Sequence, residues 1–122
     1  NILNFIENHK TAKHFCIFDE LFSGTNPYEA VATAYGYLSY ISKNPNIRFM
    51  LTTHYIRLCK LFKKTKNIEN ANMETKLIND TPRYSYKIVK GISKIKGGIM
   101  VLRQLDYPEK IIEEANNIIQ KL

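Results

Sequence analysis

Two short apolar segments of the chain run into side chains that could carry out phosphate chemistry. Residues 15–18 are four consecutive apolar residues, and Asp19 and Glu20 follow them directly. A second, mostly apolar segment, residues 47–51, continues into two threonines and His54. Carboxylates and an imidazole brought together at one place can bind a cation, orient a water molecule and contact a phosphate.

Each of these three side chains suits one task at a phosphate. Asp19 can hold Mg²⁺ through water, because this small hard ion keeps several waters and takes few protein ligands. Glu20 points elsewhere, because side chains alternate along a strand, and it can orient a water for attack on phosphorus. His54 can donate a hydrogen bond to a terminal phosphate. The three can meet because ligands of open α/β sheets bind beyond the carboxyl ends of the strands.

The elements that must position these side chains form a strand, helix and strand. The apolar run 15–18 predicts a strand that is buried on both faces, as in parallel sheets. A helix is predicted from Pro27 to about residue 42, with Asn26 as its N-cap and proline at the first helical position. Residues 47–54 predict a second strand. This βαβ unit indicates an α/β fold with parallel strands.

The rest of the chain predicts helices around a hairpin. We expect helices near residues 1–10, 55–63 and 98–105, and a last helix opened by Pro108 with one apolar stripe. Two strands, 73–78 and 83–89, are expected on either side of a four-residue turn, 79–82. Tyr84 and Tyr86 lie among lysines on the second of these strands. They could stack on bases, but half-buried hairpin positions are the stronger expectation.

Size and charge limit the classes of protein. The 122 residues favour one domain, and no apolar run approaches the length that spans a bilayer. We expect no membrane partner and, with only two cysteines and no signal peptide, an intracellular location in cytoplasm or nucleus. The net charge is +7, and residues 57–66 and 83–103 contain no acid. Such segments attract phosphates, although lysine-rich helices are also ordinary solvated surfaces.

Three segments resemble one protein family in order and spacing. FCIFDELFSGTNPYEAVATAYGYL, LTTHY and YKIVKGISKIKGGIMVLRQLDYPEKIIEEA are similar to the MutS family, a branch of the ABC-type P-loop ATPases. The first resembles the Walker B strand and the loop after it, and the second resembles the switch-histidine segment. In the third, Gly91, Gly98, Pro108 and Ala115 hold matching places. The resemblance covers nearly the whole chain.

The resemblance implies that residues 1–122 are the C-terminal half of a P-loop (ABC-type) ATPase domain, with a parallel βαβ core and a C-terminal hairpin and helices. It implies ATP and Mg²⁺ as cofactors, Asp19 at the metal, and Glu20 and His54 as catalytic residues. Ser23, Gly24, Thr25 and Asn26 match the loop that reaches toward a partner's nucleotide. The implied partners are DNA, through the full-length protein, and a second MutS-like subunit in a head-to-tail homodimer, with residues 106–122 as a possible dimerisation element.

Two departures from the family pattern restrict this interpretation. The chain contains no GxxxxGK[ST] motif, so we expect this piece alone to bind ATP poorly and to hydrolyse little or none. The loop also lacks the Gly-Arg that usually precedes Gly-Thr in mismatch-repair members, which indicates a divergent branch and leaves mismatch recognition open. Two alternatives remain: another ABC-type ATPase, or a non-catalytic basic module for nucleic-acid binding or dimerisation.

Overall fold

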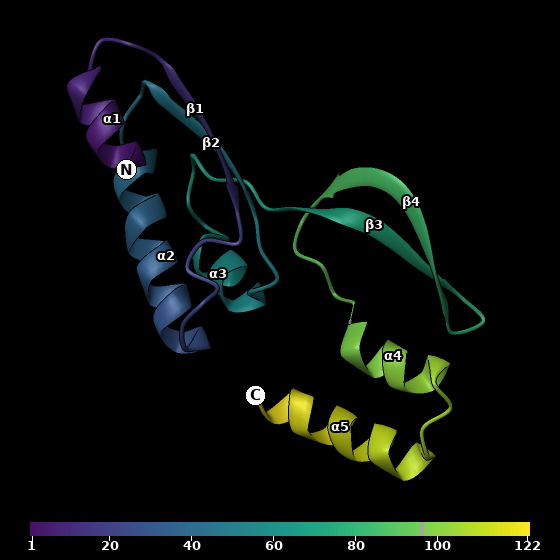
Figure 1. Ribbon diagram of the computed structural model, residues 1–122. Helices are drawn as coiled ribbons and strands as arrows, with labels where there is room; N and C mark the ends of the chain where they lie inside the picture. The colour runs from purple at the N-terminus through teal and green to yellow at the C-terminus, as the bar shows by residue number, and fades with distance from the viewer. Residues whose placement is uncertain (96) are drawn as a thin grey trace. The chain divides into compact units, whose positions relative to one another are not determined.

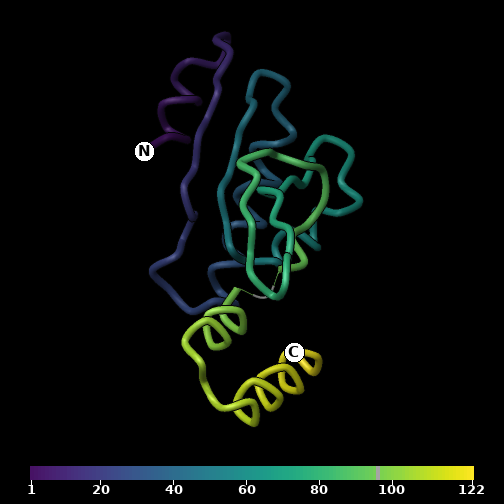
Figure 2. The backbone as a smooth tube through the Cα atoms, turned by 90° about the vertical axis from the view of Figure 1, so that its right-hand side faces the viewer, coloured from purple at the N-terminus to yellow at the C-terminus, as the bar shows by residue number. Residues whose placement is uncertain are grey.

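The computed structural model of the chain describes every residue except 96. The chain has two compact units, residues 1–70 and 71–122. Helices occur in both units, with a parallel sheet in the first and an antiparallel sheet in the second (Figures 1 and 2). The fold is therefore mixed α/β. Among the described residues, no helix has the length and apolar character needed to cross a membrane.

The first unit contains the predicted strand, helix and strand. β1 pairs with β2 in parallel, in a register that runs from His14 opposite Ile47 to Asp19 opposite Thr52. In Figure 1 the two strands lie side by side. The helix α3 is shorter than the predicted 55–63. The elements of this unit are α1 (Ile2–Asn8), β1 (His14–Asp19), α2 (Pro27–Ser42), β2 (Ile47–Thr52) and α3 (Ile56–Leu61).

The start of α2 is as the sequence predicts. The Asn26 side chain accepts a hydrogen bond from the backbone N–H of Tyr28 at 2.9 Å, and Pro27 is the first helical residue. One face of α2 carries buried residues at helical spacing, and this face packs in the core of the unit. The buried core residues are Ile6, Cys16, Phe18, Val31, Ala34, Leu38, Ile41, Leu58 and Phe62.

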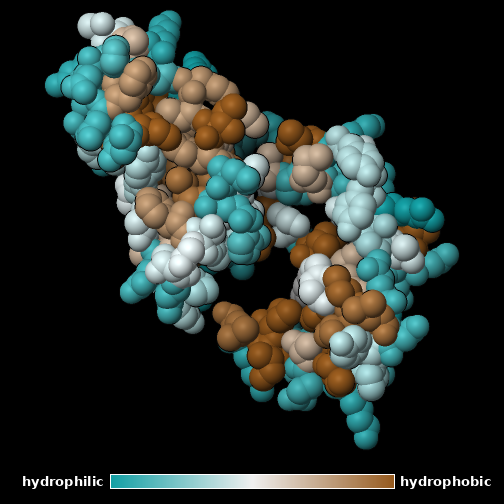
Figure 3. Space-filling model, viewed as in Figure 1, coloured by the Kyte–Doolittle hydropathy of each residue, from teal (hydrophilic) through white to brown (hydrophobic). Residues whose placement is uncertain are grey.

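The prediction that the first strand is buried on both faces is wrong for this chain. Cys16 and Phe18 of β1 are buried, but Phe15 is 61% exposed and Ile17 is 72% exposed. Met50 of β2, opposite Ile17, is 57% exposed. The core lies on one face of this two-stranded sheet only, so the apolar side chains of the other face remain open to solvent. Figure 3 shows apolar side chains at the surface of the molecule.

The second unit begins with a hairpin whose turn is shorter than predicted. β3 (Ala71–Ile78) pairs with β4 (Thr81–Lys90) in antiparallel orientation, and Ile78 lies opposite Thr81. The turn is therefore two residues, Asn79 and Asp80, with φ of 52° and 60°. These left-handed angles are those of the type I′ turn that joins tightly paired strands. The predicted four-residue turn is wrong because Thr81 and Pro82 belong to β4.

A bulge interrupts β4, and both tyrosines of this strand are exposed. The register shifts between Met73 and Thr75, and Tyr86 has a φ of +59°. A bulge inserts unpaired residues and changes the direction of side chains along the strand. Tyr84 is 62% exposed and Tyr86 is 84% exposed, so the expected half-buried placement is wrong.

Two helices follow the hairpin. α4 spans Gly97–Gln104 and α5 spans Glu109–Lys121, with Pro108 at the N-cap of α5. Ile112 is 2% exposed and Ile99 is 7% exposed, and they are the buried apolar residues of the two helices. Most of the apolar stripe predicted for the last helix is open to solvent. Its exposed members are Ile111, Ile118, Ile119 and Leu122.

Candidate active site

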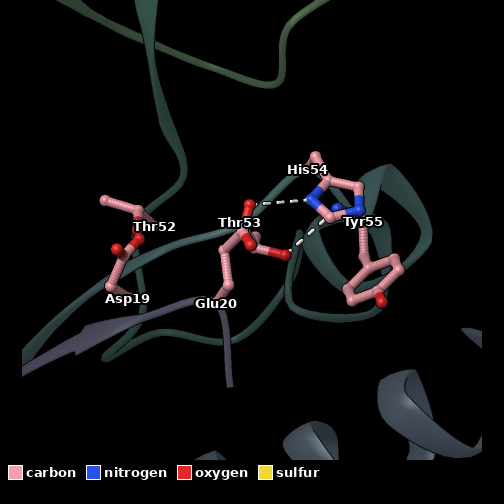
Figure 4. A network of polar contacts seen from close by, with 6 residues as sticks. All are labelled: Asp19, Glu20, Thr52, Thr53, His54 and Tyr55. Carbon is pink, nitrogen blue, oxygen red and sulfur yellow. Dashed lines mark hydrogen bonds and ion pairs between the residues drawn. The ribbon is translucent and has the colours of Figure 1, made fainter. Parts of the chain in front are cut away.

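The carboxyl ends of β1 and β2 hold Asp19 in a defined contact. Asp19 and Thr52 are the last pair of the parallel register. The Thr52 hydroxyl donates a hydrogen bond to Asp19 Oδ1 (Figure 4). The Asp19 carboxylate is exposed to solvent. At the carboxyl end of the sheet, Oδ1 of Asp19 therefore accepts a hydrogen bond from a protein hydroxyl group.

Glu20 follows with an unusual backbone conformation. Its φ is +53°, in the left-handed region that costs most L-residues about 1–2 kcal/mol. The backbone N–H of Glu20 donates to the carbonyl oxygen of Thr52 at 2.9 Å, which continues the pairing one residue beyond β1. Left-handed residues outside glycine concentrate where the surrounding structure fixes them, often at functional sites. The backbone therefore turns immediately after Asp19 and at the second acid.

His54 lies against Glu20. Its Nδ1 is 3.0 Å from Glu20 Oε1, and the two side chains are 64% and 47% exposed. Thr53 shapes the short connection to α3, because its hydroxyl oxygen accepts a hydrogen bond from the backbone N–H of Tyr55 at 3.0 Å. The ring of Tyr55 lies 4.5 Å from the ring of His54, centroid to centroid. The second strand thus delivers an imidazole to the carboxylate that follows the first strand (Figure 4).

Of the predicted loop residues 23–26, the last two contact the start of α2 and the first two are exposed to solvent. Thr25 donates a hydrogen bond to Glu29 Oε2 at 3.1 Å, and Asn26 caps α2, so both side chains hold the start of that helix. Ser23 and Gly24 are exposed at the tip of the loop. A Cβ placed on Gly24 would have no neighbour within 4 Å. The loop is therefore anchored at its helix end and open at its tip.

The exposed Asp19 carboxylate is a donor of the kind that hard divalent cations prefer. Outside residue 96, which the structure does not describe, no group of three His, Cys, Asp or Glu could hold a metal ion by itself. Mg²⁺ does not need such a cage, because it is commonly bound by one or two carboxylates together with waters and substrate phosphates. The exposed Asp19 carboxylate supplies hard oxygen donors, so its chemistry is compatible with Mg²⁺.

Comparison with known proteins shows the family of the chain. Residues 2–122 match the family described as MutS domain V. The chain belongs to the MutS family. It is 32% identical to the DNA mismatch repair protein MutS of Aquifex pyrophilus over 117 residues. This aligned segment covers 96% of the chain and 14% of that relative. It is 35% identical to the endonuclease MutS2 of Clostridium perfringens strain SM101 over 119 residues. This aligned segment covers 98% of the chain and 15% of that relative.

This MutS-family chain therefore spans about a seventh of the length of these relatives. The sequence predicts a site from its two acids and its histidine, but it assigns no role to the hydroxyls beside them. Thr52 contacts Asp19, and Thr53 holds the turn that carries His54. Their position at the end of the second strand is the signal that the sequence offers. The contact between Thr52 and Asp19 can be predicted from it only when the register of the two strands is known.

Proposed function

We propose that the chain is the C-terminal half of the ATPase domain of a MutS-family protein that couples ATP binding and hydrolysis to the binding of mismatched or structured DNA. The family match over residues 2–122 and the names of the relatives support this proposal. The observation that carries it is the contact of 3.0 Å between His54 and Glu20, beside Asp19 at the end of the parallel strands. The chain alone lacks a P-loop motif, and we expect it to be inactive as a separate piece.

The proposed reaction gives each residue a separate task. Asp19 would hold Mg²⁺ through water, and the ion would neutralise charge on the phosphates. Glu20 would accept the proton of the attacking water while the new oxygen–phosphorus bond forms and the bond to the β-phosphate oxygen breaks. His54 would donate a hydrogen bond to the γ-phosphate. Its contact with Glu20 keeps the base and this sensor within one hydrogen-bond distance.

The proposed assembly is a head-to-tail homodimer with the nucleotide between two subunits. The loop residues Ser23, Gly24, Thr25 and Asn26 would approach the partner's nucleotide. This role is compatible with a loop that is fixed at α2 and open at its tip. The segment 106–122 would contribute to the interface through apolar side chains that are exposed in this chain, such as Ile118 at 47% and Leu122 at 84%.

The substitution Glu20→Gln in the full-length protein tests the proposal. It keeps the shape of the side chain but removes the base, so ATP turnover is expected to fall at least about 100-fold. Binding of ATP, measured by equilibrium dialysis, is expected to remain. Glu7→Gln, at an exposed position of α1, is the matched control and should leave turnover unchanged. Turnover of the Glu20 variant within about twofold of the unmodified protein would show that Glu20 is not the base.

One observation favours a second candidate, a basic module that binds nucleic acid without hydrolysing ATP. Five basic side chains of α3 and the following turn are exposed, namely Arg57, Lys60, Lys63, Lys64 and Lys66. Titration of the protein with duplex DNA at two salt concentrations tests this role, because contacts to phosphates weaken steeply as salt rises. Affinity that is undetectable or independent of salt would count against it. The family match argues against a third alternative, another ABC-type ATPase.

A further inference from the structure

We infer that Thr52 is a positioning residue that sets the Asp19 carboxylate for binding of the metal. This inference rests on the proposed function, since it gives Asp19 a cation to hold. Two contacts support it. The Thr52 hydroxyl donates to Asp19 Oδ1, and the Thr52 carbonyl oxygen accepts from the backbone N–H of Glu20 at 2.9 Å. One residue of β2 thus contacts both acids that follow the apolar segment of β1.

The contact with Asp19 has a consequence for how the carboxylate meets a cation. Asp19 is exposed, so without a partner its side chain would exchange among rotamers in water. The hydroxyl of Thr52 occupies Oδ1 and leaves Oδ2 to receive a cation or its bound water. Donation to a charged acceptor is among the stronger hydrogen bonds. The hydrogen bond therefore favours one orientation of the carboxylate before the metal arrives.

The two contacts of Thr52 use different atoms, and this makes the inference testable. The contact with Glu20 uses the backbone carbonyl, which every substitution retains. The contact with Asp19 uses the side-chain hydroxyl, which valine lacks and serine keeps. Thr52→Val preserves the β-branched shape that suits a strand, so it removes the donor with little change of volume. A purely structural role for Thr52 would require its shape and not its hydroxyl.

Binding of Mn²⁺ to the full-length protein, in the presence of a non-hydrolysable ATP analogue, gives a readout that does not depend on turnover. Electron paramagnetic resonance measures the free Mn²⁺ during a titration. We expect the dissociation constant for Mn²⁺ to rise about fivefold in Thr52→Val, from loss of one hydrogen bond. In Thr52→Ser it should stay within about twofold of the unmodified protein. The Mg²⁺ concentration that gives half-maximal turnover should shift in parallel.

The variant Asp19→Asn separates failure of this inference from failure of the proposed function. If Asp19→Asn weakens Mn²⁺ binding but Thr52→Val leaves it within about twofold of the unmodified protein, Thr52 does not position the ligand. If Asp19→Asn also leaves binding unchanged, Asp19 is not at the metal and both ideas fall. Equal weakening by valine and serine would assign the effect to packing and also overturn the inference. Should the valine variant fail to fold, Thr52→Ala replaces it in the same comparison.

Discussion

Two phenylalanines of β1 offer a test of the one-sided burial of the parallel sheet. Phe18 is 5% exposed, and its ring lies 5.6 Å from the ring of Tyr37 and 6.5 Å from the ring of Phe49, centroid to centroid. Phe15 is on the opposite face of the same strand and is 61% exposed. The substitutions Phe18→Ala and Phe15→Ala therefore remove the same atoms from one strand, but from environments that differ in burial.

The expected costs differ because the covered areas differ. Truncating a buried phenylalanine to alanine typically costs about 3–5 kcal/mol, which includes the cavity left behind. Full burial of such a side chain is worth about 1.5–3 kcal/mol. Because Phe15 keeps 61% of its surface in water, it can lose only about two-fifths of that amount, or about 1 kcal/mol. We expect Phe18→Ala to cost at least about 2 kcal/mol more than Phe15→Ala.

Hydrogen exchange in the 122-residue chain can measure both costs. Exchange of the backbone amides of β1 and β2, followed by NMR, gives the free energy of opening of the sheet itself. Thermal denaturation followed by circular dichroism serves as an independent check. Equal losses for the two variants would mean that the face bearing Phe15 is covered in solution, and the description of a one-sided sheet would be wrong.

Further predictions concern the loop, the hairpin and the thiols. Asn26→Ala removes the cap of α2 and should lower the free energy of unfolding by about 1 kcal/mol, measured by urea denaturation; an unchanged midpoint would exclude the cap. Asp80→Gly should stabilise the hairpin by about 0.5 kcal/mol, because glycine adopts the left-handed φ of 60° without strain; slower exchange of the β3 and β4 amides would confirm it. Burial raises the pKa of the Cys16 and Cys59 thiols, so iodoacetamide should modify both slowly near neutral pH, and mass spectrometry can follow the reaction. A raised pKa in the folded state means that the associated stability is fully present below the ordinary pKa of a thiol. This contribution is lost as pH rises through the raised value, so the two thiols should lower the urea midpoint only at pH values above about 8.5.

The sequence predicted best those features that neighbouring residues decide. The start of α2 depends on Asn26 and Pro27, which act within one turn of the helix, and it is confirmed. The acids after the apolar segment were expected at the end of a strand, and β1 does end at Asp19. The parallel pairing of β1 and β2 followed from the helix between them and is also confirmed.

Features that depend on distant segments were not predictable in the same way. Burial of Phe15 depends on what covers its face of the sheet, and the apolar character of the residue cannot reveal that. The sequence predicts the hairpin but includes Pro82 in its turn, because proline is common in turns. In the structure Pro82 lies opposite Leu77 in the ladder. The contact between Thr52 and Asp19 required the register of two strands that are 33 positions apart in sequence at that point.

The left-handed backbone at Glu20 limits which amino acids can occupy that position. Valine, isoleucine and threonine carry a branched Cβ that collides with the backbone at a φ of +53°, whereas glycine, asparagine and aspartate tolerate such angles. A saturation library at this codon would therefore be filtered first by conformation and only then by chemistry. Inactive β-branched variants from such a library would report on misfolding of the turn, and the carboxylate should be judged from glutamine, asparagine and aspartate alone.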